Sequence, residues 1–233
     1  MDGESLDDLK LLIFPRFDLH QEKSCPRVSK SAHRYFLGPI MNHKSIQIIN
    51  QEHATISAML YSIEMMERRG PKGNRALFFE VLRSMLFYID EFPEKQHHPK
   101  ENLYLFPPVL KKAPELKDAI EQLELDHKVG EYRIRELQHL LLRWEILGDE
   151  HQAAFKLAYK KYHDFYLHHL QLENSLILPK ALKVLDEQEW ALMDEAFEEN
   201  TDPWLEHSGQ GVYQNLFSKI TNHAPAPIGL GEQ

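Results

Sequence analysis

The chain has 233 residues, of which 42% are hydrophobic and 27% charged, so it has the composition of an ordinary globular protein of one domain with extensions or two small domains. Its formal net charge of −9 argues against a nucleic-acid-binding surface, because phosphate binding needs clustered Lys and Arg. Cys25 is the only cysteine, so neither an intrachain disulfide nor a multi-cysteine metal site can form.

The first forty residues resemble neither a leader nor a folded element. The N-terminus reads MDGESLDDLK, which is acidic where a signal peptide would be basic, and no apolar run approaches the ~20 residues of a membrane helix. We therefore expect a cytoplasmic protein without a membrane partner. Residues 1–41 lack sustained periodicity and predict an irregular arm that docks on the rest of the chain or on a second copy, which would make a homodimer.

Helical periodicity begins at Asn42, a plausible N-cap. Apolar residues and His53 follow at alternating steps of three and four until Arg68-Arg69-Gly70-Pro71, a typical helix end. A second helix is expected from about Arg75 to Phe92. Pro93 should kink or break it before it resumes and stops near Pro107-Pro108.

Two further long helices complete the pattern. One starts after Pro114 and ends at Gly148; the other ends at Pro179. A shorter helix is predicted from Asp186 to Glu199, followed by a tail rich in Pro and Gly. The sequence therefore predicts an all-α fold, with an antiparallel up-down four-helix bundle over residues 42–180 and a C-terminal helix plus extended tail over residues 181–233.

An internal repeat lies within these four helices. Residues 97–107 read HHPKENLYLFP and residues 169–179 read HLQLENSLILP, so both follow H-x-x-x-E-N-x-x-x-x-P at an offset of 72 residues. Upstream of each copy stands an acidic residue followed by histidine, Glu52-His53 and Asp126-His127. Helices 1–2 and 3–4 are thus two copies of one unit.

The spacing within the repeat favours metal binding. Residues at i and i+4 share a helix face, so each His-x3-Glu aims one imidazole and one carboxylate at a common point. A single histidine on an apolar stripe is usually a satisfied core residue. Four histidines and two glutamates in a twofold pattern differ, because each buried polar group left unpaired costs about 1–3 kcal/mol. Such a set converging from four helices is typical of a two-metal site.

At these residues the chain resembles the hemerythrin-like family, over roughly residues 42–180. The family has a His on helix 1, H-x3-E on helix 2, a His on helix 3 and H-x3-E or a close variant on helix 4. The resemblance implies a hemerythrin-like bundle with two non-haem iron ions, bridged by the two glutamates and ligated terminally by the histidines. The matching residues are His53, His97, Glu101, His127, His169 and Glu173.

One departure from the family pattern concerns helix 3. Oxygen-carrying hemerythrins place a second His four residues after the first, where this chain has Glu131. Glu131 is either a seventh ligand or leaves a water-filled position, and in both cases reversible oxygen carriage is less favoured. Family members that repair iron–sulfur clusters have paired cysteines near the N-terminus, which the lone Cys25 does not supply.

A different set of ligands and a different metal ion are the alternatives to this site. Glu94-x2-His97 and Glu124-x2-His127 match the Glu-x-x-His motif of ferritin-like proteins, with Glu52 or Glu64 and Glu173 as partners, but this leaves the repeat unexplained. Zinc prefers four ligands, whereas mixed imidazole and carboxylate ligation at five or six positions suits iron, or manganese with fewer histidines.

Neighbours of the proposed ligands have expected roles as well. His98 and His168 fall on other helical faces, where they either support the ligands from outside or lie at the surface, and the surface is favoured. Glu52 and Asp126 are predicted to be solvated or ion-paired. Gly130 would leave space for a ligand channel or a close helix approach. Tyr104 and Tyr166 either donate a hydrogen bond to a bound small molecule or pack in the core. An apolar shell is expected from Ile56, Leu60, Ile134 and Leu172.

No nucleophile motif, phosphate loop or dinucleotide fingerprint is present, so no catalytic residues are predicted. The sequence favours a protein that binds oxygen, nitric oxide or peroxide for sensing, storage or stress response. A di-iron oxidase or peroxidase and an iron-handling protein are the alternatives.

A mutational expectation follows from the repeat. His97→Ala or Glu101→Ala should remove one or both irons in metal analysis of the purified chain, whereas His98→Ala should retain them. The opposite pattern would place the register wrong by one residue.

Overall fold

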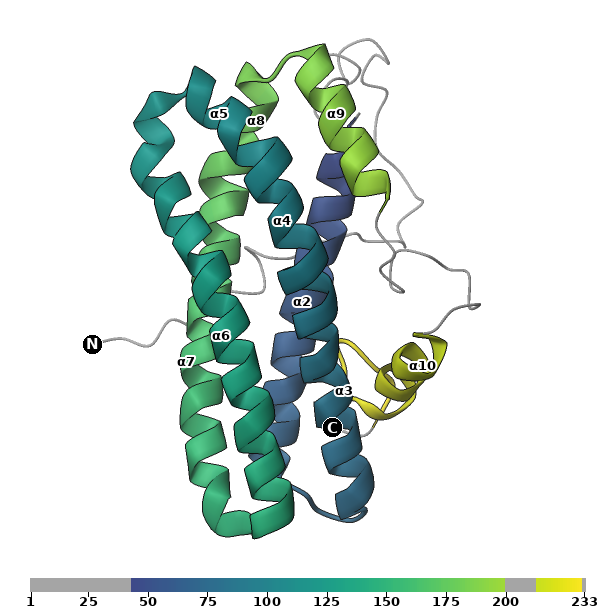
Figure 1. Ribbon diagram of the computed structural model, residues 1–233. Coiled ribbons are helices and arrows are strands. Elements are labelled where there is room, and N and C mark those ends of the chain that lie inside the picture. The colour runs from purple at the N-terminus through teal and green to yellow at the C-terminus, as the bar shows by residue number, and fades with distance from the viewer. Residues whose placement is uncertain (1–42, 200–212, 232–233) are drawn as a thin grey trace, which may run out of the picture. The chain divides into compact units, whose positions relative to one another are not determined.

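The computed structural model describes residues 43–199 and 213–231, and its long elements are all helices (Figure 1). The predicted arm, the Asn42 cap and part of the tail lie outside these residues, and the predicted domain boundaries stay predictions. The α-helices are α2 (Lys44–Arg69), α3 (Arg75–Ile89), α4 (His98–Lys100), α5 (Phe106–Lys112), α6 (Lys117–Leu147), α7 (Gln152–Leu172), α8 (Leu178–Val184), α9 (Glu187–Glu198) and α10 (Gln214–His223).

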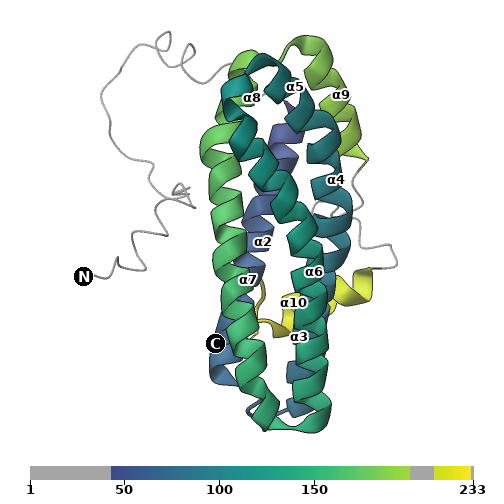
Figure 2. The ribbon, with the colours of Figure 1, turned by 60° about the vertical axis from the view of Figure 1, so that its left-hand side comes forward.

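The helices from α2 to α8 form an antiparallel bundle. In Figures 1 and 2, α2 descends, α3 to α5 ascend, α6 descends, and α7 with α8 ascends. The lower turns follow Gly70 and Gly148, whose φ angles of 69° and 118° favour glycine. The predicted all-α, antiparallel four-helix bundle is therefore confirmed.

Prolines do not end the helices where the sequence predicts. Three π-helical stretches, η1 (Asp90–His97), η2 (Glu101–Leu105) and η5 (Glu173–Ile177), carry the chain past or up to them. A π-turn inserts an extra residue into the helical ladder, and this change of hydrogen-bond register accommodates a residue that has no N–H. The predicted ends at Pro107-Pro108 and Pro179 are therefore wrong, since the rods continue to Lys112 and Val184. Of the kink or break predicted at Pro93, the break is wrong, because Pro93 lies inside η1.

The apolar core of the bundle is divided into two clusters. The lower cluster is centred on Trp144, whose ring lies 5.6 Å from Phe78, 5.1 Å from Phe79 and 5.6 Å from Phe155 between centroids. The upper cluster includes Ile49, Leu105, Phe106, Leu123, Ile177 and Met193. On each of the four rods, the polar residues of the repeat fall between the two clusters.

Helix α9 covers the upper cluster. Its predicted start is confirmed by a capping box, in which Asp186 accepts from Gln188 and Glu189 backbone N–H groups and Glu189 returns a bond to the Asp186 N–H. The Asp194 carboxylate accepts hydrogen bonds from the backbone and hydroxyl of Ser45, at 2.9 and 2.5 Å. These bonds join α9 to the first turn of α2.

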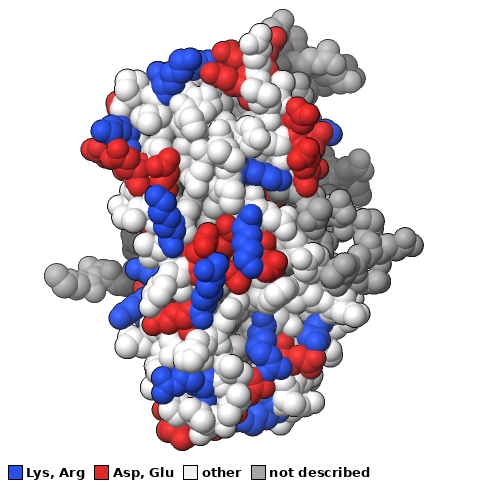
Figure 3. Space-filling model, in the orientation of Figure 1, with Lys and Arg blue, Asp and Glu red and all other residues white. Residues whose placement is uncertain are grey.

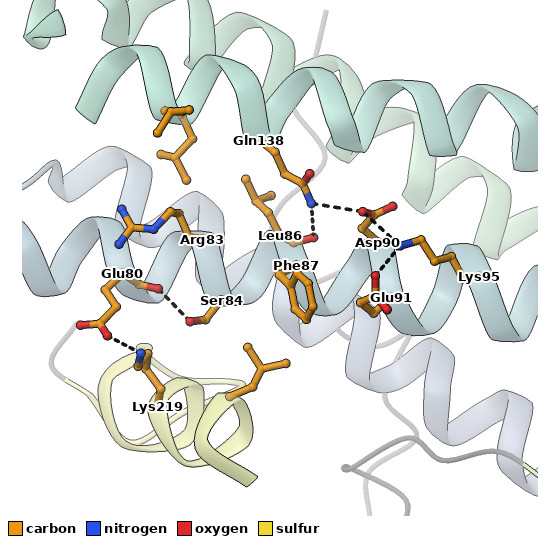
Figure 4. A pocket seen from close by; sticks show the side chains of 13 residues that line it. Glu80, Arg83, Ser84, Leu86, Phe87, Asp90, Glu91, Lys95, Gln138 and Lys219 are labelled. Carbon is orange, nitrogen blue, oxygen red and sulfur yellow. Dashed lines mark hydrogen bonds and ion pairs between the residues drawn. The ribbon is translucent and has the colours of Figure 1, made fainter. Parts of the chain in front are cut away.

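The segment from α10 to residue 231 docks beside α3 at the lower end. Ser62 of α2 is fully buried; its hydroxyl donates to the Pro225 carbonyl at 2.8 Å and accepts from the Ile228 N–H at 3.2 Å. Lys219 pairs with Glu80 on α3. A groove of about 710 Å³ lies between α3, α6 and α10 (Figure 4), and it contains none of the predicted metal ligands.

Acidic and basic side chains alternate on the face seen in Figure 3, so no field of one sign covers it. Among residues 43–199 and 213–231, no helix has the length and apolar character needed to cross a membrane.

Ser62→Ala should loosen the C-terminal segment, because it leaves a carbonyl and an N–H without their partner. We expect a loss of about 1–3 kcal/mol in the free energy of unfolding and faster hydrogen exchange of the Ile228 amide. Ser84→Ala is the control, since its hydroxyl donates to the Glu80 carbonyl of its own helix. Unchanged exchange at Ile228 would show that the segment docks without Ser62.

Candidate metal centre

The six residues of the repeated pattern meet in one buried layer midway along the bundle. Each of the four rods contributes at least one of them, and none of the six is more than 4% exposed. They are His53 of α2, His97 at the end of η1, Glu101 at the start of η2, His127 of α6, His169 of α7 and Glu173 at the start of η5.

One donor group consists of His53, His97, Glu101 and Glu173, with one possible ligand atom of each within 4.8 Å of the others. His97 Nε2 lies 3.0 Å from Glu101 Oε1, and His53 Nε2 lies 3.3 Å from Glu173 Oε2. The two Nε2 atoms are 3.2 Å apart. Two imidazoles and two carboxylates thus face one point.

A second donor group shares Glu101 with the first and adds His98, His127 and His169. Glu101 turns Oε2 toward His127 Nε2 at 3.5 Å, while its Oε1 faces His97 in the first group. One carboxylate therefore reaches both groups with different oxygens, the disposition that a bridge between two metal ions needs.

Glu173 also spans both groups. Its Oε2 lies 3.3 Å from His53 Nε2 and 3.6 Å from His169 Nε2, and its Oε1 lies 4.0 Å from His127 Nε2. The two glutamates of the repeat thus occupy equivalent central positions.

Asparagine side chains contact the outward Nδ1 atoms of His53 in α2 and His127 in α6. Asn174 Oδ1 lies 2.9 Å from His53 Nδ1, and Asn102 Oδ1 lies 3.0 Å from His127 Nδ1. An amide oxygen can only accept, so Nδ1 carries the proton and the Nε2 lone pair faces the layer. Asn174 of the second copy of the repeat thus orients His53 of the first copy, and Asn102 of the first copy orients His127 of the second.

Acidic residues hold the other two histidines. Glu52 Oε2 lies 2.5 Å from His97 Nδ1, and Asp126 Oδ2 lies 3.6 Å from His169 Nδ1. Glu52 is 5% exposed and Asp126 is 7% exposed, so both are ion-paired rather than solvated. All four imidazoles are thus oriented with Nε2 inward, in the way that outer carboxylates and amides orient metal-binding histidines.

Asn102 and Asn174 were not predicted to take part in the site. The signal was present, because the repeat contains Glu-Asn in both copies. Each asparagine follows its glutamate by one residue at the start of a π-helical stretch, and the tertiary fold aims it across the bundle.

The chemistry of this layer fits a metal cation. Both oxygens of Glu101, both oxygens of Glu173 and the Nε2 atoms of His127 and His169 are buried without a hydrogen-bond partner. Each such atom costs about 1–3 kcal/mol or more. Short distances to one another do not relieve this cost, because the contacts lack hydrogen-bond geometry. A cation would satisfy them together.

The pKa shifts of His97 and Glu101 indicate that negative charge is concentrated in this layer. Burial lowers the pKa of His97, but the facing carboxylates of Glu101 and Glu52 outweigh it and raise the pKa well above its ordinary value. Burial raises the pKa of Glu101, and Glu173 raises it further. Burial lowers the pKa of His127 to about 3, despite Glu173, so this imidazole is neutral.

Glu131, predicted as a seventh ligand or as the edge of a water-filled position, joins neither donor group. Its side chain is 46% exposed and pairs with Arg135 at 3.2 Å. Gly130 instead makes room for Glu94: a Cβ there would lie 2.8 and 2.9 Å from the Glu94 carboxylate oxygens. The space that Gly130 leaves is therefore filled by a buried carboxyl group, and the structure does not support Glu131 as a ligand.

His98 is buried, with 4% exposure, so the favoured of its two predicted positions, at the surface, is wrong. Its Nδ1 lies 3.0 Å from Glu94 Oε2, and its Nε2 lies 3.1 Å from the Tyr166 hydroxyl. Burial, and then the neighbouring His127, lower the pKa of His98 well below its ordinary value. Tyr104 is 37% exposed and so does not pack in the core, and His168 is exposed as expected.

The structure does not assemble the ferritin-like alternative. Glu124 joins neither donor group, and Glu64 pairs with Arg68 on the surface of α2. Glu94 bonds His98 and Tyr162 rather than His97.

Comparison with known proteins agrees with this arrangement. The model of the hemerythrin HHE cation-binding domain matches residues 44–181, more than half of the chain. The chain belongs to the hemerythrin HHE cation-binding domain family. No curated protein matches it in a sequence comparison. The hemerythrin-like domain spans α2 to α8, and its buried cluster of histidine and glutamate fits the cation site that the family description states.

The asparagines of this hemerythrin-like domain should tune the metal without ligating it. Asn174→Ala leaves His53 Nδ1 unheld, and we expect metal affinity to fall about 10- to 100-fold while the saturating metal content is unchanged. Competition of Fe²⁺ binding against a chelator measures this. Asn50→Ala, at an exposed site on the same α2 rod, is the control. An Asn174→Ala affinity equal to that of Asn50→Ala would contradict the holding role.

Proposed function

We propose that the buried layer holds two non-haem iron ions, which bind a small ligand such as oxygen, nitric oxide or peroxide for sensing, storage or stress response. The observation that carries this proposal is the pair of overlapping donor groups, each with four possible ligands, that share Glu101. A single ion would leave the donors of one group unsatisfied. Two ions would satisfy both groups.

Charge balance supports a pair of divalent ions. Five buried carboxyl groups lie in or against the donor groups: Glu52, Glu94, Glu101, Asp126 and Glu173. Burial raises the pKa of Glu94 to about 8, so this group is mostly neutral at pH 7 and the other four can carry four negative charges. Two divalent cations carry four positive charges. Without metal, protons compensate in part, since facing carboxylates outweigh burial and raise the pKa of both His97 and His169.

The ligand set favours iron over zinc. Zinc is usually held by four ligands, and iron accepts mixed imidazole and carboxylate sets with five or six positions. Because four imidazoles and two carboxylates serve two ions through shared glutamates, each iron would retain a position at which a small molecule can bind.

The enclosure of the layer supports a small ligand. The six repeat residues are all buried, and aromatic rings cover them from two sides: Phe106 stacks on His127 at 5.6 Å and Phe197 meets His97 edge-on at 5.8 Å between centroids. Ile56, Leu60 and Ile134 of the predicted apolar shell are buried, and Leu172 is partly buried. A diatomic molecule or peroxide can enter such packing through local fluctuations, whereas a larger substrate would need a cleft.

Metal analysis combined with optical spectroscopy tests the proposal. The purified chain loaded with Fe²⁺ without oxygen should contain about two irons, as expected for a two-metal site. A binding protein should show an absorption band that appears with oxygen and disappears on its removal. Irons that oxidise once and stay oxidised would favour an oxidase or peroxidase, and exchangeable iron whose loss costs helix content would favour iron handling. About one zinc, or no metal, would overturn the proposal.

Single ligand variants sharpen this test. Glu101→Ala should reduce the content of both ions because Glu101 faces both groups, and His53→Ala should affect one. His139→Ala, at an exposed site on α6, is the control and should retain both. Equal iron in Glu101→Ala and His139→Ala would place the metal elsewhere.

A further inference from the structure

The internal symmetry of the hemerythrin-like domain is broken beside one donor group. At the 72-residue offset of the repeat, His98 corresponds to Leu170, which is buried in the lower apolar core. His127 follows His53 by 74 residues, and at that offset Gly130 corresponds to Ile56, also a core residue. Each copy therefore has one aliphatic side chain, Ile56 or Leu170, at a position where the other copy has Gly130 or His98.

The broken symmetry brings a fifth imidazole to the layer. His98 stacks on His127, with centroids 4.0 Å apart and planes 8° from parallel, and its ring lies 5.4 Å from that of His169. One of its nitrogens lies within 4.8 Å of possible ligand atoms on Glu101, His127 and His169. The first donor group contains no counterpart of this histidine.

His98 is held like the other histidines of the layer. Glu94 Oε2 lies 3.0 Å from its Nδ1, one helical turn earlier, as Glu52 holds His97. Glu94 is 1% exposed and is fixed by the Tyr162 hydroxyl at 3.2 Å. With Nδ1–H donating to Glu94, the Nε2 lone pair lies 3.1 Å from the Tyr166 hydroxyl, which would have to turn away for Nε2 to bind a metal. Gly130 leaves room for the Glu94 carboxylate, because a Cβ at this position would lie 2.8 and 2.9 Å from its oxygens and Glu94 would have to shift.

We propose that His98 is a metal ligand of the group formed by Glu101, His127 and His169, so that one ion has three imidazoles and the other has two. This inference rests on the proposed two-metal function. The additional ligand then comes from His98, at the start of α4, and not from Glu131 of α6, where the sequence predicted it. The inference also reverses the expectation that His98→Ala retains the metal, because that expectation placed His98 at the surface.

The test uses His98→Leu, which installs the residue of the opposite copy, in the full chain loaded with ⁵⁷Fe²⁺. The wild-type chain should give two Mössbauer doublets because its irons have unlike ligand sets. In His98→Leu one doublet should change, and chelator competition should show one iron at least about tenfold weaker. His168→Leu is the matched control, since this exposed histidine flanks His169 as His98 flanks His97.

A second variant guards against misfolding. His98→Gln offers Glu94 and Tyr166 a polar partner but no imidazole, so it should reproduce the spectral change with a circular dichroism melt close to that of wild type. Spectra and affinities of both variants equal to those of His168→Leu would overturn the role of His98 while two irons remain. A wild-type chain that binds no metal would instead overturn the proposed function, and this inference with it.

Discussion

Burial of charged and polar ligands between two apolar clusters is the constraint on which the bundle depends. Trp144 anchors the cluster below the layer and Met193 lies in the cluster above it, so water cannot satisfy the groups between them. Each group needs an internal partner, because an unpaired buried polar atom costs about 1–3 kcal/mol. The Nδ1 atoms of His53, His97 and His127 have such partners. The carboxylate oxygens of Glu101 and Glu173 have none. A cation resolves this conflict where hydrogen bonds cannot.

The holding bonds also explain why the two copies form one domain. Asn174 of the second copy orients His53 of the first, and Asn102 of the first orients His127 of the second. Neither pair of helices alone can fix the tautomers of its own first histidine. The repeat therefore encodes a site that exists only when all four rods have packed, which couples assembly of the bundle to formation of the donor groups.

Departure from twofold symmetry is confined to one side of the layer. Ile56 and Leu170 close one side with aliphatic packing, whereas Gly130 and His98 open the other to an imidazole and its carboxyl partner, Glu94. The side chain missing at Gly130 makes room for the Glu94 carboxylate. Two positions with the same central glutamates can thereby differ in their imidazole ligands, and so in the reactivity of a metal held there.

The sequence by itself determined the four rods and the six repeat residues, because apolar periodicity and the i to i+4 relation are local properties of a helix. Only the tertiary structure decided which neighbours join them. The rod containing His97 is flanked by α2 on one side and by α6 and α7 on the other, so the adjacent His98 is buried as well. Glu131 shares a helix face with His127, yet Glu94 fills the space over Gly130 and Arg135 pairs with Glu131. Such outcomes depend on side chains from other helices, which spacing along one helix cannot reveal.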